Sequence, residues 1–347
     1  MIVLIVLAAV GRHFQLKLEV ERFRDKLKAD GRLLELSQAI AKPPSPESNR
    51  AENFRRAADL IEQSSAFFFT NTFGGKEMVA PGKALRLSKQ AEIVEPGKYG
   101  FTNTWEDLSK AISQSEELSA NLDRILESPF VDLEVSYARG FINSGFFTNL
   151  HLLEWKRACH FLQSKAVLNL HEGDSGAAIK DNRAMLALVH AMKDQRLVIS
   201  ELIRIAIASI GQNTTWEILQ SEKLSGDGLA SLQRDWERLD FVQGYGHALA
   251  VEQSVDDITL AQWRNSNEEL NKYFAFIQNA SQHFLLEDDD MPSTSNRVKQ
   301  SIQFFVWRHW WSYVDELRSL KGFNVLIETV RESQTNADFA ALSDKQK

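Results

Sequence analysis

The sequence predicts an all-α protein with many helices, arranged as an orthogonal bundle or as an irregular α-solenoid-like domain, with one irregular, loop-rich segment. Two observations carry this prediction. Residues 151–210 contain no proline, and their only glycines are Gly173 and Gly176, at one turn. The 347-residue chain has only seven prolines and 17 glycines, and most of the prolines lie between residues 43 and 100. The rest of the chain is therefore free to form helices.

The composition is typical of a globular protein and excludes several classes of function. Hydrophobic residues make up 44% of the chain and charged residues 25%, and the length suits one large core or two domains. The net charge of −7 argues against a nucleic-acid partner, because contact with phosphates needs a basic face. The single cysteine, Cys159, excludes an intrachain disulfide and a cysteine-based zinc site, and its helical apolar context predicts a small core residue.

Residues 1–11 form an apolar segment, IVLIVLAAV from Ile2 to Val10, which ends at Gly11. The run is too short to span a bilayer, which takes about 20 residues. It also lacks the basic start of a signal peptide. The favoured interpretation is the end of a transmembrane helix cut short at Met1. A short membrane-associated anchor and the start of a buried helix or strand are the alternatives.

Residues 12–41 are predicted to form a basic helical arm. Between Arg12 and Arg32 seven Lys or Arg residues face four acidic ones, a net charge of +3, which would attract anionic lipid headgroups. A heptad seam favours packing on another helix of the same chain over a coiled-coil dimer. The seam consists of Leu16, Val20, Phe23 and Leu27. Gly31 is expected to end this helix, and a second short helix is expected over residues 31–41.

A proline-rich linker over residues 42–49 is predicted to separate the arm from a helical domain over residues 50–335. That domain begins with a helix over residues 50–63 and contains an irregular segment over residues 64–103, where two Pro-Gly pairs predict turns. Helix resumes over residues 104–128, followed by a short strand or an extended connector over residues 130–137. A polar tail, residues 336–347, closes the chain.

The organising element is expected to be the helix–turn–helix of residues 151–210. Asp174 or Ser175 is the expected cap of its second helix. A third helix, residues 197–210, is apolar almost all round and is predicted to be a buried core helix. Ala166, Gly173-Asp174 and Ala178 match the small-residue and turn positions of one tetratricopeptide repeat, but no second copy follows.

No catalytic residue, cofactor site or metal site is predicted. The spacing of His151, Glu154 and His160 does not match a di-iron or zinc motif. We therefore expect these side chains to lie on the surface, or to be partly buried with their hydrogen bonds made within the protein. The acidic run at residues 287–290 lacks the alternating ligands of a calcium loop and is expected to be a solvated loop. Gly74-Gly75-Lys76 lacks the spacing of a phosphate-binding loop.

The densest aromatic cluster lies at residues 304–313. Phe304, Trp307 and Trp311 are spaced i, i+3 and i+7, which would place them on one face of a helix. Core packing is the favoured interpretation. A protein interface or a contact with lipid headgroups is the alternative, because Trp is frequent at such boundaries. These three residues are the candidate interface residues.

Several stretches together resemble a known family. They are the apolar start, the basic helix ending at Ala29-Asp30-Gly31, the Lys42–Pro46 linker, the segment Met78–Gly82 and the block of residues 151–210. In these stretches the chain is similar to a family of uncharacterised bacterial proteins that carry one N-terminal membrane anchor and a helical extracytoplasmic domain. The resemblance implies a cell-membrane location with the bulk of the chain outside the cytoplasm, and it supplies no functional residues.

The leading hypothesis for function is a membrane-tethered helical interaction or scaffold protein of the cell envelope without catalytic activity. Its expected partner is a membrane, reached through the N-terminal segment; a protein partner and the oligomeric state are left open. One alternative is an enzyme with a site under the loops of residues 64–103. Another is a peptide-binding adaptor similar to tetratricopeptide proteins. A soluble cytoplasmic protein is the alternative for location.

Overall fold

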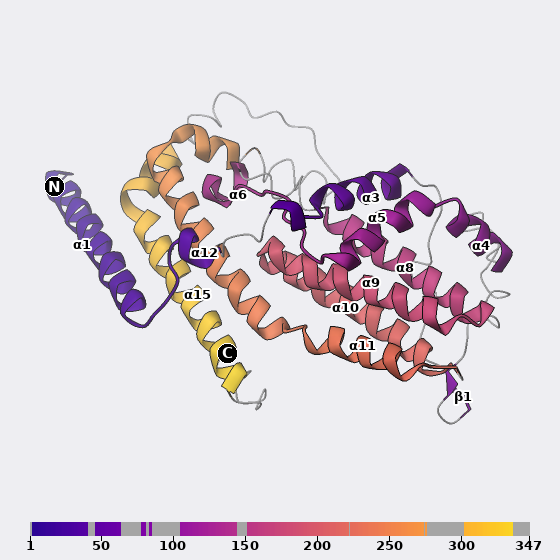
Figure 1. The fold of residues 1–347 in the computed structure, drawn as a ribbon. Helices are drawn as coiled ribbons and strands as arrows, with labels where there is room; N and C mark the ends of the chain where they lie inside the picture. The colour runs from indigo at the N-terminus through magenta and orange to yellow at the C-terminus, as the bar shows by residue number, and fades with distance from the viewer. Residues whose placement is uncertain are drawn as a thin grey trace. The chain divides into compact units, whose positions relative to one another are not determined.

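The computed structural model describes residues 2–40, 46–63, 78–80, 83–84, 105–143, 151–221, 223–273, 275 and 302–335. These residues are helical or in connections, apart from one hairpin of β1 (Met78–Ala80) and β2 (Lys83–Ala84), so the predicted all-α class is confirmed (Figure 1). The chain divides into two compact units. Unit 1 comprises Met1–Lys42, Glu134–Asn149 and Tyr245–Lys347, and unit 2 comprises Pro43–Leu133 and Leu150–Gly244.

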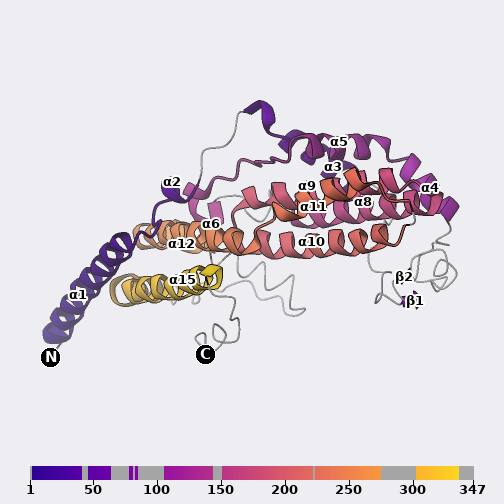
Figure 2. The same cartoon turned by 60° about the horizontal axis from the view of Figure 1, so that its bottom comes forward.

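Unit 2 is a helical bundle built on three neighbouring helices. These are α8 (Leu152–Glu172), α9 (Ser175–Met192) and α10 (Val198–Leu219), which lie side by side in both views (Figures 1 and 2). The other elements of the unit are η1 (Pro46–Ser48), α3 (Ala51–Gln63), the β1–β2 hairpin, α4 (Trp105–Ser113), α5 (Glu116–Glu127), η4 (Lys193–Gln195), α11 (Gly226–Glu237) and the first residues of α12. Helix α3 packs on α5 and α8, and α5 also packs on α9.

The turn between α8 and α9 confirms the predicted helix–turn–helix. Gly173 ends α8 with φ of 86°, a left-handed conformation that glycine adopts without strain. The side chain of Asp174 then accepts a hydrogen bond of 2.8 Å from the amide of Ala177 and caps α9. Ala166 and Ala178 are fully buried where the two helices meet, because small side chains allow the backbones to approach closely.

The centre of unit 2 is aromatic and aliphatic. The rings of Phe54 on α3 and Trp155 on α8 stack with centroids 3.9 Å apart, and neither side chain is exposed. Cys159, four residues after Trp155 on α8, is buried as predicted, and burial raises the pKa of its thiol well above the ordinary value. Such a thiol stays protonated and is therefore a packing residue.

Helix α10 corrects the prediction of a buried, apolar core helix over residues 197–210. It continues to Leu219, and its aliphatic residues Ile199, Leu202 and Ile205 are 44–51% exposed. Two of its charged residues, Glu201 and Arg204, are buried instead. Because these two residues pair with each other and Arg204 also bonds to α9, the polar side of the helix turns inward and an apolar stripe is left outside.

Unit 1 contains the two termini and three long helices. They are α1 (Ile2–Ala29), the greater part of α12 (Phe241–Asn265) and α15 (Ser312–Thr335). Helix α15 runs alongside α12 in both views (Figures 1 and 2). The shorter elements are α2 (Leu36–Ala39), η3 (Tyr137–Arg139), α6 (Gly140–Asn143) and the π-helical turn η5 (Trp307–Trp311), which leads into α15.

Helix α1 joins the apolar segment to the basic arm without a break at Gly11. Its predicted seam is confirmed as a contact within the chain, because Val20 and Leu27 are buried against Leu320 of α15. Gly31 ends the helix as predicted, with φ of 73° and a hydrogen bond of 3.0 Å from its amide to the carbonyl of Lys28. Among the described helices none has the length and hydropathy needed to cross a bilayer.

Three further predictions of secondary structure are refined and one is confirmed. The second helix of the arm is limited to Leu36–Ala39. The predicted helix over residues 104–128 is two helices, α4 and α5, because the backbone turns at Gln114 and Ser115. Residues 130–136 form a connector without strand pairing, in which Glu134 has a positive φ of 60°. The helix over residues 50–63 is confirmed as α3, where the Asn49 side chain accepts a hydrogen bond of 3.0 Å from the Ala51 amide.

Candidate functional site at the α1, α12 and α15 junction

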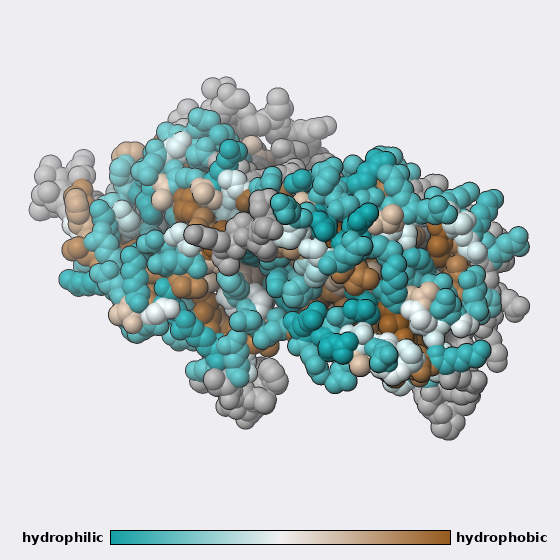
Figure 3. Space-filling model, viewed as in Figure 1, coloured by the Kyte–Doolittle hydropathy of each residue, from teal (hydrophilic) through white to brown (hydrophobic). Residues whose placement is uncertain are grey.

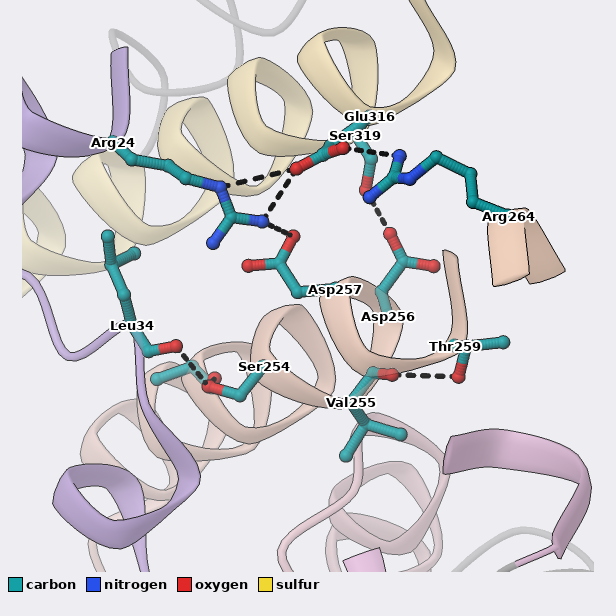
Figure 4. A network of polar contacts seen from close by, with 11 residues as sticks. Arg24, Leu34, Ser254, Val255, Asp256, Asp257, Thr259, Arg264, Glu316 and Ser319 are labelled. Carbon is teal, nitrogen blue, oxygen red and sulfur yellow. Dashed lines mark hydrogen bonds and ion pairs between the residues drawn. The ribbon is translucent and has the colours of Figure 1, made fainter. Parts of the chain in front are cut away.

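Charged side chains from three helices meet inside unit 1. We refer to them as the charge cluster: Arg24 of α1, Asp256, Asp257 and Arg264 of α12, and Glu316 of α15 (Figure 4). Figure 4 shows the two guanidinium groups on opposite sides of the Glu316 carboxylate, so α15 is linked through this one side chain to both other helices.

The cluster is held by short ion pairs. Nη2 of Arg24 lies 2.9 Å from Oδ1 of Asp257 and 2.7 Å from Oε1 of Glu316. Nη1 of Arg264 lies 2.5 Å from the other oxygen of Glu316. The hydroxyl of Ser319 donates a hydrogen bond to Oδ2 of Asp256. Arg264 also lies over the ring of Tyr313, 4.7 Å from its centroid, an arrangement that favours the cation.

Burial makes this cluster electrostatically unusual. The side chains of Glu316 and Asp257 are only 3% and 10% exposed. Loss of water raises the pKa of Asp257 to about 7 in spite of Arg24, because desolvation disfavours the charged form. Burial likewise raises the pKa of Asp256, although the Ser319 hydroxyl opposes the shift. Three carboxylates face two guanidinium groups, so one bound proton makes the cluster neutral.

Helical spacing explains how the cluster is assembled. Arg24 follows Val20 by four residues and precedes Leu27 by three, so it lies on the same face of α1 as the seam. Glu316 precedes Leu320 by four residues and lies on the matching face of α15. Sequence analysis missed the cluster because the Arg24–Glu316 bond joins residues 292 positions apart.

An apolar surface rich in aromatic rings lies on α1 and on residues 302–311, which precede α15. We call it the aromatic surface; its members are Val10, Phe14 and Leu18 of α1, together with Ile302, Phe305, Trp310 and Trp311, and they are 43–63% exposed. The ring of His13 lies 4.9 Å from that of Tyr313 and 6.4 Å from that of His309, which joins the two segments. Brown side chains mark the α1 part in Figure 3.

The three predicted interface residues do not share one environment. Phe304 is buried at 5%, Trp307 is half-buried and donates a hydrogen bond of 2.8 Å to Asp315, and Trp311 is 54% exposed. The cause is the π-helical turn, which adds about one residue per turn and shifts the i, i+3, i+7 spacing off a single face. Phe305 and Trp310, which the spacing did not select, are exposed instead.

The other sequence candidates contribute no chemistry to this site. His160 is buried and lies 3.3 Å from the amide oxygen of Gln163, and burial lowers its pKa. His151 precedes α8 in a left-handed conformation. In the part of the chain that the structure describes, no group of His, Cys, Asp and Glu is placed to hold a metal ion. The acidic run at residues 287–290, and the segment of residues 64–103 apart from its hairpin, lie outside the described residues.

Comparison of the chain with protein-family models, with curated proteins and with solved structures found no match. The charge cluster and the aromatic surface are therefore the two features from which a function can be inferred.

Proposed function

We propose that the protein is a membrane-tethered helical scaffold in which α1 and the aromatic surface contact lipid and the helices of unit 2 bind a partner. One observation carries the proposal. Within the described residues every strongly exposed aromatic ring lies on α1 or in residues 302–311, and these rings are Phe14, Phe305, Trp310 and Trp311. The exposed large apolar side chains of unit 2 are all aliphatic.

Physical chemistry favours a lipid surface as the partner of these rings. Trp and Phe side chains partition to the boundary between headgroups and acyl chains, where a ring can bury its apolar body. The apolar run from Ile2 to Val10 begins α1, and the stretch from Arg12 to Arg32 that follows has a net charge of +3. A basic segment next to an apolar one binds anionic membranes more strongly than neutral ones. The location proposed is the cell membrane, with the bulk of the chain outside the cytoplasm.

The test is co-sedimentation of the full chain with vesicles of zwitterionic lipid and with vesicles that also contain anionic lipid. We expect binding that increases with the anionic fraction. The triple variant Phe305→Ala, Trp310→Ala, Trp311→Ala should bind about tenfold more weakly or worse, since each removed ring subtracts apolar contact with the bilayer. Its matched control is Ile199→Ala, Leu202→Ala, Ile205→Ala on α10, which should bind as the wild type does. Equal binding by the two variants would exclude the aromatic surface as the lipid contact.

The apolar stripe of α10 favours a second candidate function, the binding of a protein or peptide by unit 2. Ile199, Leu202 and Ile205 are exposed, while Glu201 and Arg204 of the same helix are buried. An uncharged apolar helix face of this kind suits a partner helix. A photoreactive residue that replaces Leu202 should form cross-links to a partner in cells. The same residue in place of the exposed Lys180 should form none of these cross-links. Cross-linking at both positions alike would argue against a specific partner.

A further inference from the structure

We propose that the docking of α1 onto α12 and α15 is coupled to the binding of one proton by the charge cluster, so that α1 is a proton-controlled arm. This inference stands independently of the membrane role proposed above. It concerns the contact between helices of unit 1, and the same coupling would operate whatever α1 binds when it is released.

The first step in the argument is that the cluster lies across the docking contact. Arg24 is the member supplied by α1, and it pairs with Asp257 of α12 and with Glu316 of α15 at once. The apolar part of the contact, Val20 and Leu27 against Leu320, lies on the same face. Release of α1 would therefore remove a guanidinium group from two carboxylates and admit water to both.

The second step is that the docked cluster has one negative charge more than it has positive ones. The groups that face Asp257 are Arg24 from α1, Glu316 from α15, and Asp256 and Arg264 from α12 itself. Oδ2 of Asp257 is buried without a hydrogen-bond partner among the described residues. A protonated carboxyl would remove the excess charge from a site where the acids are largely shielded from water, and an unpaired buried charge is costly.

The third step is the sign of the coupling. Burial, the largest cause, raises the pKa of Asp257 to about 7, and Arg24 opposes the shift. Release of α1 admits water, which lowers this pKa, and removes Arg24, which raises it; because burial is the larger cause, the docked state holds the proton up to a higher pH than the released state does. Docking is therefore strongest in acid and weakens as the pH rises towards 7. Transfer of a single proton changes the ratio of docked to released α1 by at most about tenfold per pH unit, and the ratio levels off above the docked pKa.

The experiment measures the distance between α1 and α15 by electron paramagnetic resonance from pH 4.5 to pH 8.5. Spin labels are attached at Gln15→Cys and Lys321→Cys, two exposed positions, while the buried Cys159 remains unlabelled. The measurement is made on the full chain and on a Leu27→Ala background. That change weakens the apolar contact and brings the released population into the observable range. We expect the released fraction to rise between pH 5 and pH 7 and then to level off.

Two variants decide the outcome. Asp257→Asn copies the protonated carboxyl, so docking should lose its pH dependence and remain at the acid level. Asp194→Asn alters a buried carboxyl of unit 2 whose pKa is also raised, and it should leave the pH dependence of α1 unchanged. A distance that does not respond to pH on the Leu27→Ala background would overturn the proposal, and so would a response that Asp257→Asn retains.

Discussion

One buried ion pair of unit 2 differs in its construction from the charge cluster of unit 1. In unit 2, Glu201 and Arg204 lie three residues apart on one helix, with side chains 1% and 2% exposed and 2.8 Å between charged atoms. In unit 1, Arg24 reaches from α1 to acids on α12 and α15 and is itself 29% exposed. The first pair is local in sequence and fully enclosed, whereas the second joins three helices and keeps one edge near water.

This difference indicates different roles for buried charge. Arg204 also donates to the carbonyl of Val189 on α9 at 2.9 Å and lies over the ring of Phe241. Gly244 permits this packing, because a Cβ there would lie 2.5 Å from Nη1 of Arg204. The pair therefore holds unit 2 in one arrangement. The charge cluster of unit 1 can instead open when α1 leaves, since its members belong to separate helices.

The largest expected effect comes from breaking the pair of unit 2. Arg204→Ala leaves Glu201 buried without its cation and should lower the free energy of unfolding of unit 2 by about 3–5 kcal/mol. Chemical denaturation followed by circular dichroism measures the loss. The double variant Glu201→Leu, Arg204→Met removes both charges, so most of the stability should return. If the single and double variants were equally unstable, an unpaired charge would not be the cause.

The next largest effect is the pH dependence of stability that Asp194 gives to unit 2. Burial raises the pKa of Asp194 in unit 2 to about 6 from 3.8, so its contribution to stability is present below about pH 4 and is lost as the pH rises through 6. The free energy of unfolding of Asp194→Asn should therefore exceed that of the wild type by about 1–3 kcal/mol at pH 8 and equal it at pH 4, since one pKa unit is about 1.4 kcal/mol. Asp59→Asn, at an exposed position of α3, should show no such difference in parallel denaturation curves.

A smaller loss of stability is expected when Arg24 of unit 1 is replaced. Arg24→Ala should cost about 1–2 kcal/mol, because water at the exposed edge screens the two acids that remain. Hydrogen exchange should show the loss in α1 and not in α8 or α9. Arg24→Lys keeps the charge, but an ammonium group lacks the planar set of N–H donors that a guanidinium group offers to two carboxylates. Its loss of stability should therefore lie between those of the wild type and Arg24→Ala. A cost larger than that of Arg204→Ala would break the comparison between the units.

The smallest effects are expected at the exposed apolar surfaces. Leu202→Ser on α10 and Trp311→Ser on η5, at residues 51% and 54% exposed, should each change the free energy of unfolding by no more than about 0.5 kcal/mol. Thermal unfolding measures this. Destabilisation by either change beyond about 1 kcal/mol would mean that the side chain is a packing residue.

Local features of the fold were predictable from the chain. Gly31 and Gly173 end helices in left-handed conformations, Asp174 caps α9, and Val20 and Leu27 form an inward seam. Each of these depends on residues within about one or two helical turns, which is the range over which helix periodicity and capping act. The candidate interface was predicted in part, since the aromatic density at residues 304–313 was visible but the π-helical turn was not.

The sequence by itself determined that this is an all-α protein, where several of its helices begin and end, and that α1 carries an apolar seam for packing on another helix. Only the tertiary structure decided that Arg24 meets Asp257 and Glu316, and that α10 buries Glu201 and Arg204 while Ile199, Leu202 and Ile205 stay exposed. The reason is that helical propensity is local, whereas the partner of a buried charge is chosen by packing. The cost of leaving a charge unpaired then outweighs the apolar pattern that the chain shows.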